Sequence, residues 1–249
     1  MANKMEQQVL KRNYRKIWPY TGLMLSAILV FLPFISHAAE AVSERRDVGK
    51  FHSIEFRGHG VVVLTPGYDY EVRLEGEEAL LKDYETVVDS GMLIIKSDSW
   101  LKFWRKKPIT VYVSMPLVRK LSVAGSGSIV GESTIYSDRL TLELTGSGEI
   151  ELDVETKQLG SIISGSGEIR LRGSAKAFQH TISGSGDLNA FNLETERSEI
   201  KITGSGNCEL SASNRLDVLI SGSGTVFYRG DPRTVSQEVS GSGKVKIIE

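Results

Sequence analysis

The sequence predicts an all-β protein, a right-handed parallel β-helix (β-solenoid), from a repeated tripeptide, its spacing and the residues around it. Gly-Ser-Gly occurs seven times. The first glycines of the triplets are Gly125, Gly146, Gly165, Gly184, Gly204, Gly222 and Gly241. They are separated by 21, 19, 19, 20, 18 and 19 residues, a step too short for repeats of paired helices. Glycine contributes 25 of the 249 residues and proline only 6, which excludes collagen and proline-rich linkers.

Apolar and polar residues alternate on both sides of each triplet, as in strands with one buried face. Two positions before the first glycine stand Val123, Leu144, Ile163, Ile182, Ile202, Ile220 and Val239. Four positions after it stand Ile129, Ile150, Ile169, Leu188, Cys208, Val226 and Val245. Stacked parallel strands would bring these equivalent residues together, and parallel crossovers are usually right-handed. We therefore expect rungs of about 19 residues, each with a strand, a Gly-Ser-Gly corner, a second strand and a variable loop, such as residues 172–174 or 213–215.

The first 41 residues have the features of a signal peptide. Five basic residues precede an apolar run at 22–35, and small residues follow at 36–41. The run holds about 14 residues, fewer than the ~20 that a helix needs to span a bilayer. We expect residues 1–41 to be cleaved, with an uncleaved membrane anchor as the alternative.

Residues 48–249 are expected to form a single β-solenoid domain, with an atypical N-terminal cap and first rungs at 48–120 and regular repeats at 121–249. Within the cap, Gly58-His59-Gly60 resembles a degenerate corner, since apolar residues alternate around it. Further strands are expected at 70–74, 87–88, 92–95 and 110–113, and a short helix at 77–83. Terminal repeats are atypical because they must close an end of the core.

Composition and charge narrow the possible functions. Lysine and arginine total 30 and aspartate and glutamate 31, so the formal net charge of −1 excludes a general nucleic-acid binder. The single cysteine, Cys208, allows no intrachain disulfide. Cys208 and His180 fall in inward columns, so we expect a buried thiol and a hydrogen-bonded core histidine. With so few histidines and one thiol, we expect no catalytic residues, no cofactor and no metal site.

Two segments outside the corners are candidate binding sites. The first is a loop or short helix between two expected strands, made of Trp100, Lys102, Phe103, Trp104, Arg105, Lys106 and Lys107. Aromatic rings beside cations suit membrane interfaces, lipid head groups or sugars; the alternative is that the rings plug the open end of the core. The second is a weaker candidate, an acidic edge formed by Glu149, Glu168 and Asp187. Calcium binding and a solvated acidic stripe are the alternatives for this edge.

Stacking also aligns the serines of the triplets into a row of hydroxyls. They are Ser126, Ser147, Ser166, Ser185, Ser205, Ser223 and Ser242. A regular hydroxyl row could bind a glycan or another repetitive surface. The alternative, which we favour, is that small polar residues simply fit a tight corner.

Several segments together resemble a known bacterial family. They are Ile54-x-Phe56-x-Gly58-x-Gly60-Val61, Tyr70-x-Val72-x-Leu74, Glu78-x-Leu80-Leu81, Ile109-x-Val111-x-Val113-x-Met115-Pro116 and the repeated [Ile/Leu]-[Ser/Thr]-Gly-Ser-Gly. From about Val48 onward the chain resembles the putative auto-transporter adhesin head GIN domain family, a bacterial domain of unknown function. The resemblance implies a β-helical, secreted or cell-envelope protein with a role in adhesion, and it implies no known catalytic residues.

These observations predict a non-enzymatic exported protein of the cell envelope, located in the periplasm or at the cell surface. We expect it to bind a surface, a glycan or an envelope protein, and to be a monomer or weak oligomer. Membrane contact is expected only through the N-terminal segment or the loop at 100–107. One alternative is a structural or self-assembling envelope module. A second is a glycan-active enzyme, which the short loops disfavour.

Overall fold

The computed structural model describes residues 41–97 and 108–248. The signal-peptide prediction falls on residues 1–40 and the aromatic loop on residues 100–107, so both lie outside the described residues. The described residues include one short helix, and their remaining regular structure is strand. None of their helices is long and apolar enough to cross a membrane.

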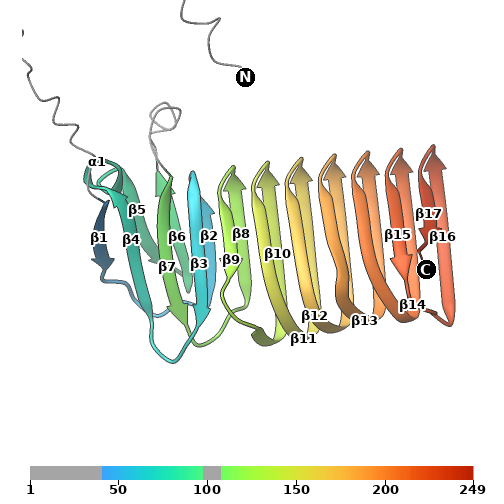
Figure 1. The fold of residues 1–249 in the computed structure, drawn as a ribbon, viewed down its shortest axis with the longest axis horizontal. Coiled ribbons are helices and arrows are strands. Elements are labelled where there is room, and N and C mark those ends of the chain that lie inside the picture. The colour runs from blue at the N-terminus through green and yellow to red at the C-terminus, as the bar shows by residue number, and fades with distance from the viewer. Residues whose placement is uncertain (1–40, 98–107, 249) are drawn as a thin grey trace, which may run out of the picture. The chain divides into compact units, whose positions relative to one another are not determined.

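Parallel strands stack coil upon coil into a β-solenoid, which confirms the predicted fold class (Figure 1). The strands of the regular coils are β8 (Lys120–Gly125), β9 (Ser128–Gly131), β10 (Ile135–Gly146), β11 (Glu149–Gly165), β12 (Glu168–Gly184), β13 (Asp187–Gly204), β14 (Asn207–Gly222), β15 (Thr225–Arg229), β16 (Thr234–Gly241) and β17 (Lys244–Ile247). Corner glycines align in register, so that Gly146 lies between Gly125 and Gly165. The sequence repeat is therefore the stacking step of the solenoid.

The central strands are longer than the sequence predicts. β11, β12, β13 and β14 run for 17, 17, 18 and 16 residues, from one corner to the next. The prediction of loops at 172–174 and 213–215 is wrong, because both segments lie within strands. Gly173 has a φ of +106°, and a Cβ there would collide with the Val154 carbonyl oxygen of the neighbouring coil. Glycine thus lets this strand bend while it stays paired with β11 and β13.

The Gly-Ser-Gly corners are glycine-rich because adjacent coils touch there. Gly184 has a φ of +127°, and a Cβ on it would lie 2.5 Å from the Gly165 carbonyl oxygen. A Cβ on Gly186 would lie 2.7 Å from the Gly167 oxygen. Between them, the Ser185 N–H donates to the Gly165 oxygen at 2.9 Å. The backbone of each corner therefore forms the hydrogen bonds between adjacent coils, and only the serine side chain projects outward.

The first coils lie in a different order in space from their order along the chain. β2 (Ser53–Arg57) lies between β6 (Met92–Ser97) and β8. β3 (Gly60–Pro66) lies between β7 (Ile109–Met115) and β9. The coil of β6 and β7 therefore lies nearer the N-terminal end of the stack than the coil of β2 and β3, although it comes later in the sequence.

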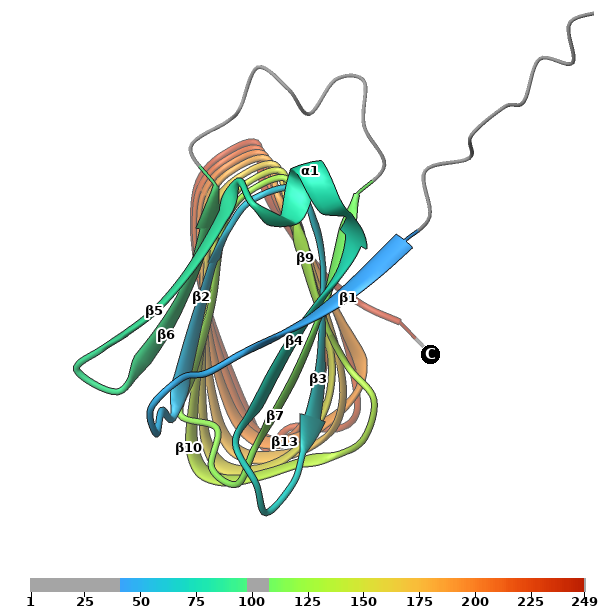
Figure 2. The same ribbon diagram turned by 90° about the vertical axis from the view of Figure 1, so that its left-hand side faces the viewer.

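Antiparallel strands and a helix cover this N-terminal end of the stack (Figure 2). β4 (Glu71–Glu77) pairs with β7, β1 (Ala41–Arg46) pairs with β4, and β5 (Tyr84–Asp89) pairs with β6, all antiparallel. The expected short helix is α1 (Glu78–Leu81), which joins β4 to β5 and buries Leu80 and Leu81. Because the pairing direction changes here, the parallel ladder ends at this cap.

A tyrosine supports the degenerate corner at His59. The Tyr84 hydroxyl donates to the His59 carbonyl oxygen at 2.8 Å and accepts from the His59 N–H at 3.2 Å. Burial raises the pKa of Tyr84, so its hydroxyl stays protonated and able to donate. Tyr84 thus supplies hydrogen bonds that the regular corners obtain from the glycine backbone of the preceding coil.

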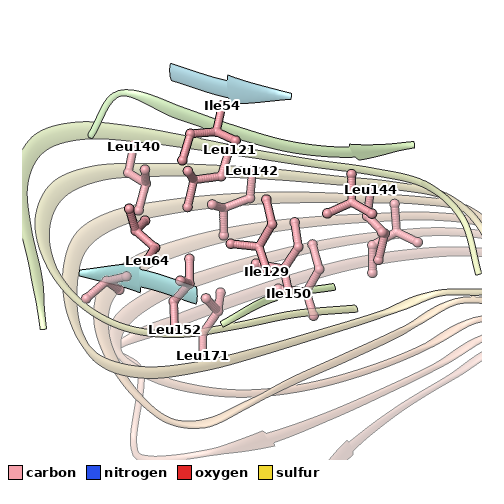
Figure 3. Close-up of a cluster of buried hydrophobic side chains, with 14 of the residues drawn as sticks. Ile54, Leu64, Leu121, Ile129, Leu140, Leu142, Leu144, Ile150, Leu152 and Leu171 are labelled. Carbon is pink, nitrogen blue, oxygen red and sulfur yellow. The ribbon is translucent and has the colours of Figure 1, made fainter. Parts of the chain in front are cut away.

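The core consists of ladders of like apolar residues between the two facing walls of the solenoid (Figure 3). Leu121 and Leu142 pair in one ladder, and Ile129 and Ile150 in another, with no side chain exposed. A fully buried side chain of this size stabilises the fold by about 1.5–3 kcal/mol. Since the chain has one cysteine, this burial and the backbone ladder hold the coils together.

Candidate binding groove

A groove of about 890 Å³ runs along the solenoid axis at the bends opposite the Gly-Ser-Gly corners. These bends lie at the lower edge of the ribbon in Figure 1. It is lined by Tyr136, Ser137, Asp138, Glu155, Thr156, Lys157, Ser174, Ala175, Lys176, Glu194, Thr195, Glu196, Ser211, Ala212, Ser213 and Gly230. β10 to β14 each contribute three consecutive residues. The groove therefore crosses five coils, a length of about 19 Å at ~4.8 Å per step.

The floor of the groove is a column of small residues. Ser137, Thr156, Ala175, Thr195 and Ala212 align by strand pairing, and the last four are at most 9% exposed. The Ser137 hydroxyl donates to the Arg139 carbonyl at 2.9 Å, and the Thr156 hydroxyl donates to the Gln158 carbonyl at 3.1 Å. These hydroxyls close the bend two residues ahead of themselves. The small side chains of the floor thus leave space for the groove, and the hydroxyls of Ser137 and Thr156 hold the backbone of the bend.

The walls of the groove are two rows of outward side chains. One row is Tyr136, Glu155, Ser174, Glu194 and Ser211; the other is Asp138, Lys157, Lys176, Glu196 and Ser213. Lys157 pairs with Asp138 at 2.7 Å. No ion pair of Glu155, Lys176 or Glu194 is found within residues 41–97 and 108–248. Both donors and acceptors therefore remain available along the groove, and Tyr136 offers a ring that is 68% exposed at one end.

The acidic edge lies on the outer face of the strands that follow the corners. Glu149, Glu168 and Asp187 align in one register column, as the sequence predicts. Arg170 extends between the first two and pairs with Glu149, and with Glu168 at 2.6 Å. Asp187 accepts from the Asn207 amide side chain at 3.0 Å. Each of these carboxylates thus has a protein donor.

The pKa of Glu168 is raised, first by partial burial and then by repulsion from Asp187, Glu151 and Glu209. In the next outward columns, Arg172 pairs with Glu151 at 3.0 Å and with Asp153 at 2.6 Å. No cluster of metal-ligating side chains is present in the part of the chain that the structure describes. This face is best described as a network of ion pairs that link adjacent coils, each worth at most about 1 kcal/mol at such exposure.

The triplet serines form an exposed ridge along the corners. Their N–H groups are used in the ladder, as for Ser147 to Gly125 and Ser166 to Gly146, both at 2.9 Å. Within the described ranges, their hydroxyls make no hydrogen bond to protein. The ridge is regular, but the triplet serines do not line the groove at the opposite bends.

The two reactive side chains in the repeats are buried, as predicted. His180 is 1% exposed, and its Nδ1 is hydrogen-bonded to the Ser161 hydroxyl at 2.6 Å. Burial lowers the pKa of His180 to about 3, so the ring is neutral. Burial raises the pKa of the Cys208 thiol well above its usual range. Both groups lie in the apolar core, out of reach of a surface ligand.

The groove was not predicted from the sequence. Its residues occur in triplets such as Glu155-Thr156-Lys157 and Glu194-Thr195-Glu196, in which a small buried residue stands between two outward polar ones. That pattern recurs once per coil and is the available signal in the sequence. The aromatic loop at 100–107 lies outside the described residues, so its role as a candidate binding site stays a prediction.

The stacked coils, the glycine corners and the groove on the opposite bends define a repeat protein of the parallel β-solenoid class. The chain belongs to the family described as "putative auto-transporter adhesin, head GIN domain", whose model matches residues 50–232. The resemblance seen in the sequence is thus confirmed. No curated protein matches the chain.

Several solved structures share the fold. A putative adhesin from Bacteroides fragilis NCTC 9343 aligns with a TM-score of 0.80 and 22% identity, over 84% of this chain and 97% of that one. A putative lipid binding protein from Parabacteroides distasonis ATCC 8503 aligns with a TM-score of 0.70 and 22% identity, over 85% and 98%. A putative adhesin from Parabacteroides merdae ATCC 43184 aligns with a TM-score of 0.67 and 18% identity, over 85% and 98%.

Proposed function

We propose that this protein is a non-enzymatic, exported cell-envelope protein that binds an extended glycan chain in the groove. The observation that carries the proposal is the course of the groove, which follows the stacking axis over five coils. A site with this shape suits a linear polymer better than a compact molecule. Export to the periplasm or the cell surface is supported by the basic and apolar N-terminal segment and by membership of an adhesin-like family.

The chemistry of the walls favours sugar hydroxyls as the bound groups. Lysine ammonium groups donate hydrogen bonds and glutamate carboxylates accept them, and both kinds line the groove. The exposed Tyr136 ring provides an apolar face with a polar tip, which suits the mixed surface of a sugar ring. One relative is described as a putative lipid binding protein. The charged walls here disfavour an acyl chain, because burying unpaired charges against hydrocarbon is costly.

The experiment measures retention of the chain on insoluble peptidoglycan, cellulose and chitin, and on a panel of immobilised acidic and neutral polysaccharides. Ser174→Trp places a large ring on the groove wall, between Glu155 and Glu194 of the same row. We expect it to weaken binding at least tenfold. Lys201→Trp is the matched control, because Lys201 is exposed on a strand outside the groove.

Two results would overturn the proposal. Equal retention of both tryptophan variants would exclude the groove as the binding site. Release of shortened sugar chains during the assay would instead favour the glycan-active enzyme, and the same fractions are therefore analysed for new chain ends.

A further inference from the structure

The C-terminal coil of the described chain has two open edges, at the far end of the stack from the cap (Figure 1). β16 pairs only with β14, and β17 only with β15, among residues 41–97 and 108–248. Every residue of β16 is exposed, including Val235 at 41% and Val239 at 40%. Ile247 of β17 is 59% exposed. Edges of this kind, with an apolar row between them, readily pair with another strand.

A hollow of about 520 Å³ lies between these two edges, at the open mouth of the core. It is lined by Gln237, Val239, Gly243, Lys244, Val245 and Lys246. The equivalent apolar positions in the preceding coil, Ile220 and Val226, are fully buried. Within residues 41–97 and 108–248, no further coil covers the core at β16 and β17.

We propose that a second copy of this chain covers the C-terminal coil, tail to tail, about a two-fold axis that bisects the Gly241-Ser242-Gly243 corner. The chain reverses direction at that corner, so β16 and β17 run in opposite directions on the two facing walls of the solenoid. A rotation by half a turn about the bisector places β16 of one copy beside β17 of the other, antiparallel. Such an interface is isologous, because each copy contributes both edges to it.

The register of this pairing follows from symmetry about Ser242. Residues equally distant from Ser242 face each other, so Val239 meets Val245 of the partner and Gln237 meets Ile247. These four side chains belong to inward columns, and the pairing buries them in one continuous core. On the outward face, Glu238 of one copy meets Lys246 of the other, twice per dimer. Opposite charges that face each other in this way stabilise antiparallel strands.

The charges also select against other arrangements. Lys244 and Lys246 on one edge would repel the same edge of a second copy, which disfavours pairing of β17 with β17. At the opposite end of the solenoid, β1, β4, β5 and α1 cover the stack. Because these strands pair antiparallel, the parallel ladder ends there, which disfavours head-to-tail growth, and we expect the assembly to close at two copies. The dimer would carry two grooves, which raises avidity for a polymer that reaches both.

The experiment is sedimentation velocity of the full chain over a wide concentration range, with charge-reversal variants. Glu238→Lys and Lys246→Glu should each shift the dimer dissociation constant upward by at least tenfold, and the double variant Glu238→Lys/Lys246→Glu should restore it. Glu199→Lys and Lys201→Glu are the matched controls on exposed positions of other coils. Lys246 also lies over the Phe227 ring at 5.7 Å, so thermal unfolding of each variant is measured alongside.

The wild-type chain remaining a monomer at every concentration would overturn the proposal. A dimer that ignores the single reversals, or that the double reversal does not restore, would also overturn it. Larger assemblies that grow with concentration would show head-to-tail stacking in place of the closed pair. None of these outcomes bears on the groove, whose residues lie on the bends of earlier coils.

Discussion

Replacing Gly184 with alanine should destabilise the whole solenoid from its central corner. Gly184 has a φ of +127°, a conformation that strains any residue with a Cβ. The added Cβ would lie 2.5 Å from the Gly165 carbonyl oxygen, whereas ordinary contacts begin at 3.4 Å. The difference, 3.4 − 2.5 = 0.9 Å, must be met by moving one coil away from the next or by rotating the corner.

The magnitude has two parts. Holding an alanine in this region of φ costs about 1–3 kcal/mol. Separating the coils weakens the hydrogen bond from Ser185 N–H to the Gly165 oxygen, which is 2.9 Å long and worth about 1 kcal/mol. The expected loss in free energy of unfolding is therefore about 2–4 kcal/mol.

The assay is urea unfolding followed by circular dichroism, with Gly160→Ala as the matched control. Gly160 lies in β11, has no positive φ, and a Cβ on it would have no atom within 4 Å. Its replacement should be neutral or stabilising by up to about 1 kcal/mol, since alanine restricts the unfolded chain. Equal midpoints for the two variants, or a Gly184→Ala midpoint at the wild-type value, would refute the steric account of the corner.

Two further predictions concern the buried groups of the core. The pKa of His180 is lowered from 6.5 to about 3, so the unfolded chain binds a proton that the folded chain does not. Stability is therefore fully present above pH 6.5 and falls by about 1.4 kcal/mol per pH unit from there toward pH 3. Urea midpoints against pH should show this slope, and His180→Leu should remove it; an unchanged slope in that variant would contradict the assignment. Cys208 should resist thiol reagents until the protein unfolds, since burial raises its pKa, and rapid modification of the native chain would contradict its placement in the core.

The candidate site could be predicted from the sequence only in part. The acidic edge was predicted, because its members recur at a fixed offset from the corner glycine and parallel register makes that offset a distance in space. The ion pairs of Arg170 with Glu149 and Glu168 were not, since they depend on a side chain reaching across to the neighbouring column, in its own coil and in the preceding one. The groove was missed because its floor and walls come from bends that the sequence presents as loops.

The parallel solenoid, its corners and its inward columns, including the burial of His180 and Cys208, can be predicted from the sequence alone. Those features are local and repeat in each coil, so a pattern of about 19 residues is enough to specify them. The spatial order of the first coils, in which β6 and β7 lie nearer the N-terminal end of the stack than β2 and β3, is visible only in the folded protein. That order, the groove across five coils and the open edges of β16 and β17 depend on which strands pair at long range. The position of a strand along the sequence does not show which strand it pairs with. The free energy of pairing depends on neighbouring side chains that only the folded stack brings together.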